Sequence, residues 1–152
     1  MKAKTKIIKV TTDLEVTVHD FPDGSIREQN EELYKLIGNG CDIIEHVMPK
    51  RLYTELHQSN KVTLEKSKCV SMLVDEEFLY RKCLKPNLIG SYLYETDKHG
   101  CPIMGNILFV GDVWSGDGIS FAGLEESVFD ELLVQLKNMA LAMKAMKGDA
   151  EV

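Results

Sequence analysis

The sequence predicts one α+β domain, in which a mixed or antiparallel sheet packs against two or three helices, the last of them long. Apolar segments typical of strands recur along the chain without forming an internal repeat. Apolar residues at helical spacing then cover its C-terminal end. Because 152 residues suit a single core, we expect the domain to span residues 1–148, with a short tail at 149–152.

The first elements are predicted to be a strand, a turn and a helix. Ile7–Val18 is rich in Ile, Val and Thr, and its even positions are largely apolar, which predicts one long strand with one buried face. Phe21–Ser25 contains Pro and Gly and is typical of a turn. Glu28–Ile37 has apolar residues at helical spacing and acids in its first turn, and Gly38–Gly40 supplies a stop. A short amphipathic helix is expected there.

The middle of the chain predicts two more strands. Cys41–Met48 suits a second strand, and the compact apolar run Cys69–Val74 suits a central one, followed by an acidic turn or a short helix through Tyr80. Lys50–Lys66 is polar and predicts no definite element.

A loop and a second pair of sheet elements are predicted next. Pro86 indicates a loop because proline cannot continue a helix. Tyr92–Tyr94 and Ile103–Val110 flank the polar residues 97–100, which predicts a hairpin or two consecutive sheet elements around a turn. Gly105 indicates a bulge or a close approach by another group.

Two interpretations fit the glycine-rich stretch Gly111–Gly123. Its backbone amides could cradle a phosphate ahead of a helix, although it lacks the lysine of a P-loop. The favoured interpretation is a hairpin turn, because Ser-Gly-Asp-Gly at 115–118 supplies the residues that tight turns require. From Leu124 to about Met146, apolar residues recur every three or four positions, which predicts a long helix ended by Gly148.

The composition argues against several classes of function. A net charge of −6 argues against a polyanion-binding surface, so nucleic acid is an unexpected partner outside local basic residues such as Lys50, Arg51, Lys61 and Lys66. The apolar runs are too short to span a membrane or to form a signal peptide. We therefore expect a cytoplasmic protein with reduced thiols and no membrane partner.

No metal site and no cofactor are predicted. Zinc needs about four cysteine or histidine ligands in close pairs. His99 and Cys101 form the only tight pair, and the remaining cysteines are scattered at Cys41, Cys69 and Cys83.

The second half of the chain carries three short motifs of one family. They are Leu84-Lys85-Pro86-Asn87, the apolar strand Ile103–Gly111 with its Ile-Met-Gly start, and Ser120–Glu126 at the start of the last helix. In these motifs the chain resembles, over roughly residues 6–136, a domain-of-unknown-function family of short proteins encoded by phages, plasmids and mobile elements. Leu88 departs from the pattern, because Arg commonly follows the Asn in that family. The resemblance implies a small α+β accessory protein and supplies no catalytic residues.

Two candidate binding surfaces follow from the sequence. A ligand pocket is predicted near Asn87, Tyr92, Tyr94, Gly105 and Trp114, where Trp114 either stacks on a ligand or packs over the sheet edge. A helix of about 23 residues would be about 35 Å long and would overhang a small sheet. Its adaptable methionines then suggest an interface for self-association or a partner, at Met139, Met143 and Met146. The alternative is that these methionines pack on the protein's own segment around Tyr53 and Leu56.

The leading hypothesis is therefore a non-enzymatic accessory protein of a phage or mobile element, expected to form homo-oligomers. It would act by binding a host protein or a small nucleotide-like ligand, for example to sequester a host defence signal. The alternative is a small hydrolase or phosphodiesterase, which requires Asp112, Asp117 and His99 to meet in one cleft.

Overall fold

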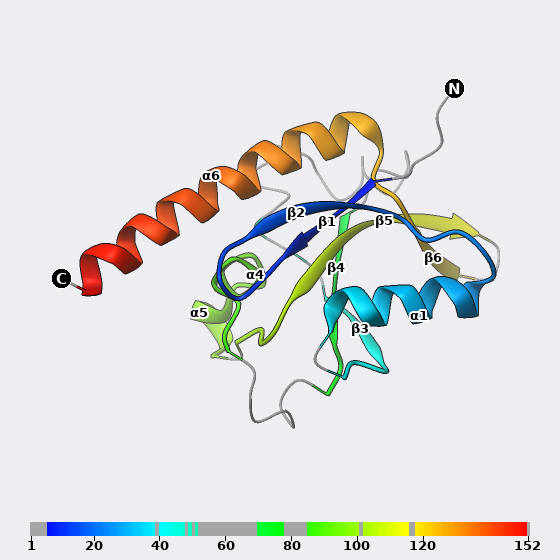
Figure 1. Cartoon of the computed structure of the whole chain (residues 1–152), viewed down its shortest axis with the longest axis horizontal. Helices are drawn as coiled ribbons and strands as arrows, with labels where there is room; N and C mark the ends of the chain where they lie inside the picture. The colour runs from blue at the N-terminus through cyan, green and yellow to red at the C-terminus, as the bar shows by residue number, and fades with distance from the viewer. Residues whose placement is uncertain are drawn as a thin grey trace.

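The computed structural model describes residues 6–38, 40–47, 49, 51, 70–77, 85–100, 102–115 and 118–151, with the backbone alone for 97, 99, 112–115, 118–120 and 147–151. Its elements are pairs of strands separated by helices along the chain (Figure 1). In order they are β1 (Lys6–Val10), β2 (Val16–Asp20), α1 (Ile26–Ile37), β3 (Ile44–Val47), β4 (Val70–Asp75), α4 (Leu88–Leu93), α5 (Thr96–His99), β5 (Ile107–Ser115), β6 (Gly118–Ala122) and α6 (Glu126–Glu151).

The six strands found among the described residues form one antiparallel sheet in the order β2-β1-β5-β4-β3, and β6 pairs with β5. Phe109 of β5 lies between Ile8 of β1 and Met72 of β4. Two residues further on, Gly111 lies between Val70 of β4 and Ala122 of β6. β6 therefore continues the sheet on the same side of β5 as β1. The predicted α+β class with a long C-terminal helix is confirmed, and the sheet is antiparallel.

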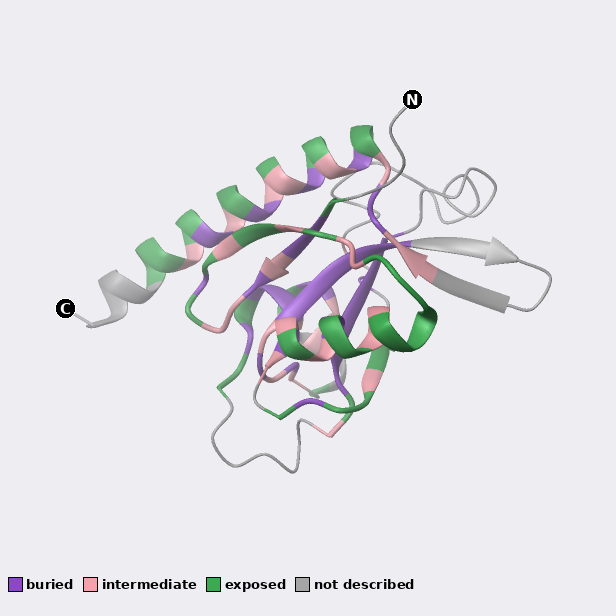
Figure 2. Ribbon diagram, turned by 45° about the vertical axis from the view of Figure 1, so that its right-hand side comes forward, coloured by how far each residue is buried: buried purple, intermediate pink, exposed green. Residues whose placement is uncertain are grey.

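Helices cover both faces of the sheet, because alternate strand residues point to opposite sides. On one face, residues such as Ile8, Met72 and Phe109 pack with the buried sides of α4 and α6. On the other face, Ile7, Leu73, Leu108 and Val110 pack with Leu33 and Ile37 of α1. Figure 2 shows the same division along α6, whose buried residues face the sheet while its exposed residues line the outer side.

Local hydrogen bonds explain why α1 forms where the sequence predicts it. The Ser25 hydroxyl accepts from the Glu28 amide, and the Glu28 carboxylate accepts from the Ser25 amide, which completes a capping box. Gly38 ends the helix with a positive φ of 77°. The predicted helix is confirmed and begins two residues earlier, at Ile26.

The predicted single strand over Ile7–Val18 is wrong, because the chain turns back at Thr11–Glu15 and forms the hairpin of β1 and β2. The Thr11 hydroxyl accepts from the amides of Asp13 and Glu15, and Leu14 adopts a left-handed φ of 65° with its side chain buried. This turn contains neither Gly nor Pro, so the apolar alternation continues through it without a visible break.

The predicted hairpin around residues 97–100 is also wrong, because Tyr92 belongs to helix α4 and Tyr94 is its C-cap. The second run of that hairpin does form a strand, β5, which begins at Ile107. The predicted strands at 41–48 and 69–74 are confirmed over Ile44–Val47 and Val70–Asp75. The segments predicted at 52–66 and at 78–80 lie outside the described residues.

The glycine-rich stretch forms the β5–β6 hairpin, in which Ser115 pairs with Gly118, so the hairpin interpretation is confirmed. A Cβ at Gly111 would lie 2.6 Å from the carbonyl oxygen of Gly123. Only glycine permits this approach of the two backbones. Helix α6 then runs through Gly148 to Glu151, so the predicted end at Gly148 is wrong. A glycine inside a helix costs about 1 kcal/mol, which does not by itself stop the helix.

Candidate functional site

The site is built on a short backbone ladder that begins at the Pro-Asn turn. Pro86 bridges Met104, the Asn87 amide donates to the carbonyl of Ile103 at 2.7 Å, and the Gly105 amide donates to the carbonyl of Lys85 at 2.8 Å. Gly105 adopts a φ of 84°, which favours glycine. This ladder holds the start of α4 against the segment that leads into β5.

Asn87 is fully buried and fixes the ladder to the sheet. Its Oδ1 accepts from the Gly90 amide at 3.0 Å and thereby caps α4. Its Nδ2 donates to the carbonyls of Val10 and Gly105, both at 3.0 Å. The three polar contacts of this side chain are therefore made inside the protein.

Helix α4 has one buried side and one exposed side. Ile89, Gly90 and Leu93 are buried, and a Cβ at Gly90 would lie 3.1 Å from the Ile107 side chain, so the helix packs closely on β5. Leu88 is 42% exposed and Tyr92, one turn later, is 38% exposed. Two large apolar side chains thus lie next to each other on the outer side of this helix.

Arg51 reaches this outer side from a distant part of the chain. Its guanidinium carbon lies 4.6 Å from the centroid of the Tyr92 ring, and its Nη1 donates to the Tyr92 carbonyl at 3.0 Å. A guanidinium within about 6 Å of an aromatic face makes a favourable cation–π contact. The Tyr92 ring is therefore held in place by a charged neighbour while part of its surface stays accessible.

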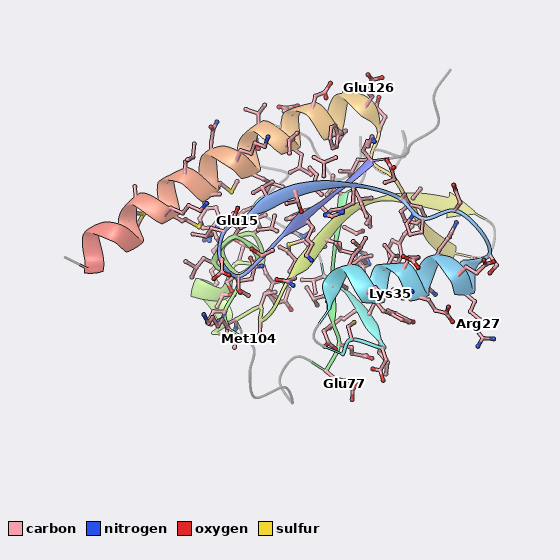
Figure 3. The ribbon with its side chains drawn as sticks, viewed as in Figure 1. Glu15, Arg27, Lys35, Glu77, Met104 and Glu126 are labelled. Atoms are coloured by element: carbon pink, nitrogen blue, oxygen red, sulfur yellow. The ribbon has the colours of Figure 1, made fainter. Side chains whose placement is uncertain are left out.

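The Glu95 carboxylate lies close to two positively charged side chains, Arg51 and Lys98. Its Oε2 lies 2.8 Å from Lys98 Nζ and 4.0 Å from Arg51 Nε. Glu95 also adopts a left-handed φ of 62° between α4 and α5, which is uncommon for a residue other than glycine. We call this surface the α4 corner and define it as Arg51, Leu88, Tyr92, Glu95 and Lys98. It lies at the end of the sheet where α4 and α5 are seen in Figure 3, close to the labelled Met104.

The structure brings four of the five predicted ligand residues to this end of the sheet, in different roles. Asn87 and Gly105 are buried in the ladder, Tyr94 is the half-buried C-cap of α4, and Tyr92 is exposed. The backbone of Trp114 lies near the far end of β5, opposite Ile119. At about 3.3 Å per residue, it is roughly 23 Å along the strand from Ile107. The five residues are therefore not brought together.

The three residues of the predicted methionine interface also differ in their surroundings. Met139 and Met143 are half-buried and pack against the protein's own core, whereas Met146 is exposed. Tyr53 and Leu56, the alternative contacts for these methionines, lie outside the described residues. The exposed apolar residues of α6 that sequence reasoning missed are Val134 and Leu141.

The other predicted groups lie partly outside the described chain. Asp117, Lys50, Lys61 and Lys66 are not described, and Asp112 and His99 are described by backbone alone, so the hydrolase alternative stays a prediction. Among the described side chains, no group of three or more His, Cys, Asp or Glu residues is arranged to hold a metal ion. Cys41 is a buried thiol whose Sγ donates to the Ile43 carbonyl at 3.5 Å.

The α4 corner was only partly visible in the sequence. The sequence predicts Tyr92 as a ligand residue near the Pro-Asn turn but assigns no role to Leu88. The spacing of four residues between Leu88 and Tyr92 is the signal that could have joined them on one helix face. Arg51, 41 residues away from its acceptor on Tyr92, gave no comparable signal.

The chemistry of the α4 corner suits recognition. Its accessible groups are an aromatic ring, an aliphatic side chain and a balanced set of charges, a composition that is common at the energetic centres of protein interfaces. Within the described part of the chain, no helix is both long enough and apolar enough to cross a membrane. Comparison with family models, curated proteins and solved structures found no match to this chain.

Proposed function

We propose that this chain is a non-enzymatic accessory protein that binds a host protein through the α4 corner. The observation that carries the proposal is the pair of exposed side chains Leu88 and Tyr92 on one side of α4, with the Arg51 guanidinium stacked on the Tyr92 ring. Tyr and Arg are the residue types most enriched among the side chains that dominate interface affinity.

The rigidity of the corner supports this role. The Arg51 hydrogen bond to the backbone of Tyr92 and the cap at Asn87 hold α4 before any partner arrives. A side chain that is already held in place loses less conformational entropy when it is buried in an interface. The Tyr92 ring therefore offers a partner apolar area at a small entropic cost.

A protein partner fits these contacts better than a small nucleotide-like ligand. A ligand pocket needs convergent polar groups, yet the Asn87 amide and the Gly105 backbone amide and carbonyl are engaged in the ladder. Trp114 lies at the other end of β5. What remains accessible is the pair of exposed side chains Leu88 and Tyr92 on one helix, and aromatic residues are enriched at protein interfaces.

The biological setting comes from the sequence motifs. Their resemblance to proteins of phages and mobile elements makes a bacterial host protein the natural partner, encountered in the cytoplasm. In this setting the protein would block or sequester a component of the host without catalysing a reaction.

The test uses a photocrosslinking amino acid at one position at a time in the full-length protein. Benzoylphenylalanine in place of Tyr92 is expected to crosslink a host protein in cell extract, and mass spectrometry then identifies that protein. Binding of the purified partner should weaken by about 30-fold with Tyr92→Ala, as expected for loss of a central interface residue worth about 2 kcal/mol. Leu88→Ala should weaken it in the same direction.

The matched control is Ile26 on α1, an apolar residue that is 71% exposed on the opposite side of the sheet. The same crosslinker at Ile26 should not capture that partner, and Ile26→Ala should leave its affinity unchanged. Equal effects at Ile26 and Tyr92 would overturn the proposal. So would native mass spectrometry that finds a small molecule retained by the wild-type protein and lost from Tyr92→Ala, because that result identifies a ligand site.

A further inference from the structure

The outer side of α6 carries an apolar pair that the protein's own core leaves uncovered. Val134 is 59% exposed and Leu141 is 67% exposed. They are seven residues apart, so they lie on one side of the helix, about 10 Å from each other. The opposite side of the same helix holds Val128, Leu132 and Leu136 in the core.

Charged residues border this pair in a definite order. Asp130, Lys137 and Lys144 follow one another at intervals of seven along one flank, and all three are exposed. Asp130 precedes the pair, Lys137 lies level with its middle, and Lys144 follows it. We call Asp130, Val134, Lys137, Leu141 and Lys144 the outer stripe of α6.

We propose that the outer stripe of α6 is the contact between two copies of this chain, with the two helices antiparallel about a two-fold axis near Lys137. An interface of this symmetry must be complementary to itself. Antiparallel pairing places Val134 of one copy against Leu141 of the other. It also places Asp130 against Lys144 on the same flank, twice per dimer.

The order of the charges selects this orientation over the parallel one. In a parallel pair each flank faces the opposite flank of the partner, so Asp130 would lie beside Glu131 of the other copy and neither Lys137 nor Lys144 would face an acid. In the antiparallel pair the opposite charges meet, and the two helix dipoles are also opposed. Figure 3 labels Glu126, the first residue of α6, and Glu15, which forms an ion pair with Lys144 of the stripe.

Two features keep this contact weak and reversible. Lys144 already lies 3.6 Å from Glu15 of its own chain, and this exposed ion pair competes with the one across the interface. The two copies of Lys137 meet near the axis, where their like charges oppose association. Replacing Lys137 should therefore strengthen the dimer, whereas replacing its neighbours on the stripe should weaken it.

The test is sedimentation velocity of the full-length protein over a concentration series. The wild type should show a concentration-dependent monomer–dimer equilibrium. Leu141→Asp or Val134→Asp should raise the dimer Kd at least tenfold, and Lys137→Ala should lower it. Ile26→Asp, which places the same charge at an equally exposed apolar position on α1, should leave the Kd unchanged.

The orientation is tested by reversing charges. Asp130→Lys alone and Lys144→Asp alone should each raise the Kd about tenfold, and the variant that combines both substitutions should recover most of the wild-type affinity. The two positions are fourteen residues apart within one chain, so no contact inside the monomer can produce this rescue.

A crosslinking experiment distinguishes the two orientations directly. Val134→Cys mixed with Leu141→Cys should form a disulfide joining positions 134 and 141 of different copies, because a disulfide requires Cα atoms about 4.4–6.8 Å apart. A disulfide between two copies of Val134→Cys would instead indicate a parallel pair and overturn the proposal. A wild type that stays monomeric throughout the series, or a dimer that Leu141→Asp does not weaken, would also overturn it.

Discussion

The Asn87 Nδ2 atom donates to the carbonyl oxygen of Val10 across 77 positions of sequence, at a distance of 3.0 Å. This hydrogen bond joins the last residue of β1 to the cap of α4. The α4 corner is therefore held in place by the central sheet as well as by its own short helix.

Replacing the fully buried Asn87 should destabilise the fold more than replacing the partly buried Asn106. Asn87→Ala removes the cap of α4 and leaves the buried carbonyls of Val10 and Gly105 without this donor, so we expect a loss of about 3 kcal/mol in the free energy of unfolding. Chemical denaturation measures it. The control is Asn106→Ala, which removes one partly buried hydrogen bond to the Ile37 carbonyl and should cost about 1 kcal/mol. Equal losses in the two variants would contradict this account.

The contact between Gly111 and Gly123 predicts a strong effect of a single methyl group. Gly111→Ala places a Cβ 2.6 Å from a backbone oxygen that cannot move without shifting β6, so we expect a loss of about 3 kcal/mol or more. Gly90→Ala is the control, because its Cβ would meet the side-chain methyl groups of Ile107 at 3.1 Å and Ile103 at 3.3 Å instead of backbone, so its cost should be clearly smaller than that of Gly111→Ala. Thermal unfolding of both variants checks the comparison.

The two sides of α6 predict opposite results for leucine truncation. Leu136 is fully buried, so Leu136→Ala should reduce stability by about 3 kcal/mol. Leu141 lies on the outer stripe, so Leu141→Ala should change the stability of the monomer by no more than about 0.5 kcal/mol. Denaturation at low protein concentration, where self-association is negligible, is the measurement. A large loss with Leu141→Ala would mean that this residue packs within its own chain.

The capping box of α1 predicts a pH dependence of stability. Hydrogen bonds from the backbone amide and side chain of Ser25 hold the pKa of Glu28 below its ordinary value of 4.5. The folded state thus binds this proton less readily than the unfolded state. The stabilisation is fully present above about pH 4.5 and is lost as the pH falls through the folded-state pKa. Denaturation between about pH 6 and 3 should therefore show a shallower acid slope for Glu28→Gln than for the wild type.

Ser25→Ala tests the other residue of the capping box. It should lower stability by about 1 kcal/mol at neutral pH, because it removes the N-cap. Ser25→Ala removes the side-chain hydrogen bond and keeps the backbone amide at position 25, so its acid slope should lie between those of the wild type and Glu28→Gln. A wild-type slope that persists in Glu28→Gln would assign the effect to other groups, such as Asp20, whose hydrogen bond with Lys6 also lowers its pKa.

Helices and strands whose ends are set by caps or turns close to them in sequence could be predicted from the sequence. The stop at Gly38 and the capping residues Ser25 and Glu28 all lie within or next to α1, and the β5–β6 hairpin has its turn residues between its two strands. The turn at Thr11–Glu15 was missed because a threonine hydroxyl and a left-handed leucine replace the usual Gly or Pro.

The α4 corner could be predicted only in part, for a different reason. Helix α4 has six residues, too few for a periodic pattern, and its cap depends on Val10, far away in sequence. Arg51 gains its role from a stacking contact that the sequence does not encode locally. Val134 and Leu141 lie on the exposed side of α6, opposite the buried residues whose spacing predicts the helix. That spacing therefore does not identify them.

The central position of β5 also has a consequence for synthesis of the chain. Among the described strands, the hairpin of β1 and β2 and the pair of β3 and β4 do not hydrogen-bond to each other, and each joins the sheet through β5. A ribosome releases β5 after both of these pairs, so the growing chain carries two separate half-sheets with open edges until residues 107–111 emerge. A nascent chain arrested before Ile107 should therefore remain susceptible to proteolysis, and protection should appear only when β5 leaves the exit tunnel.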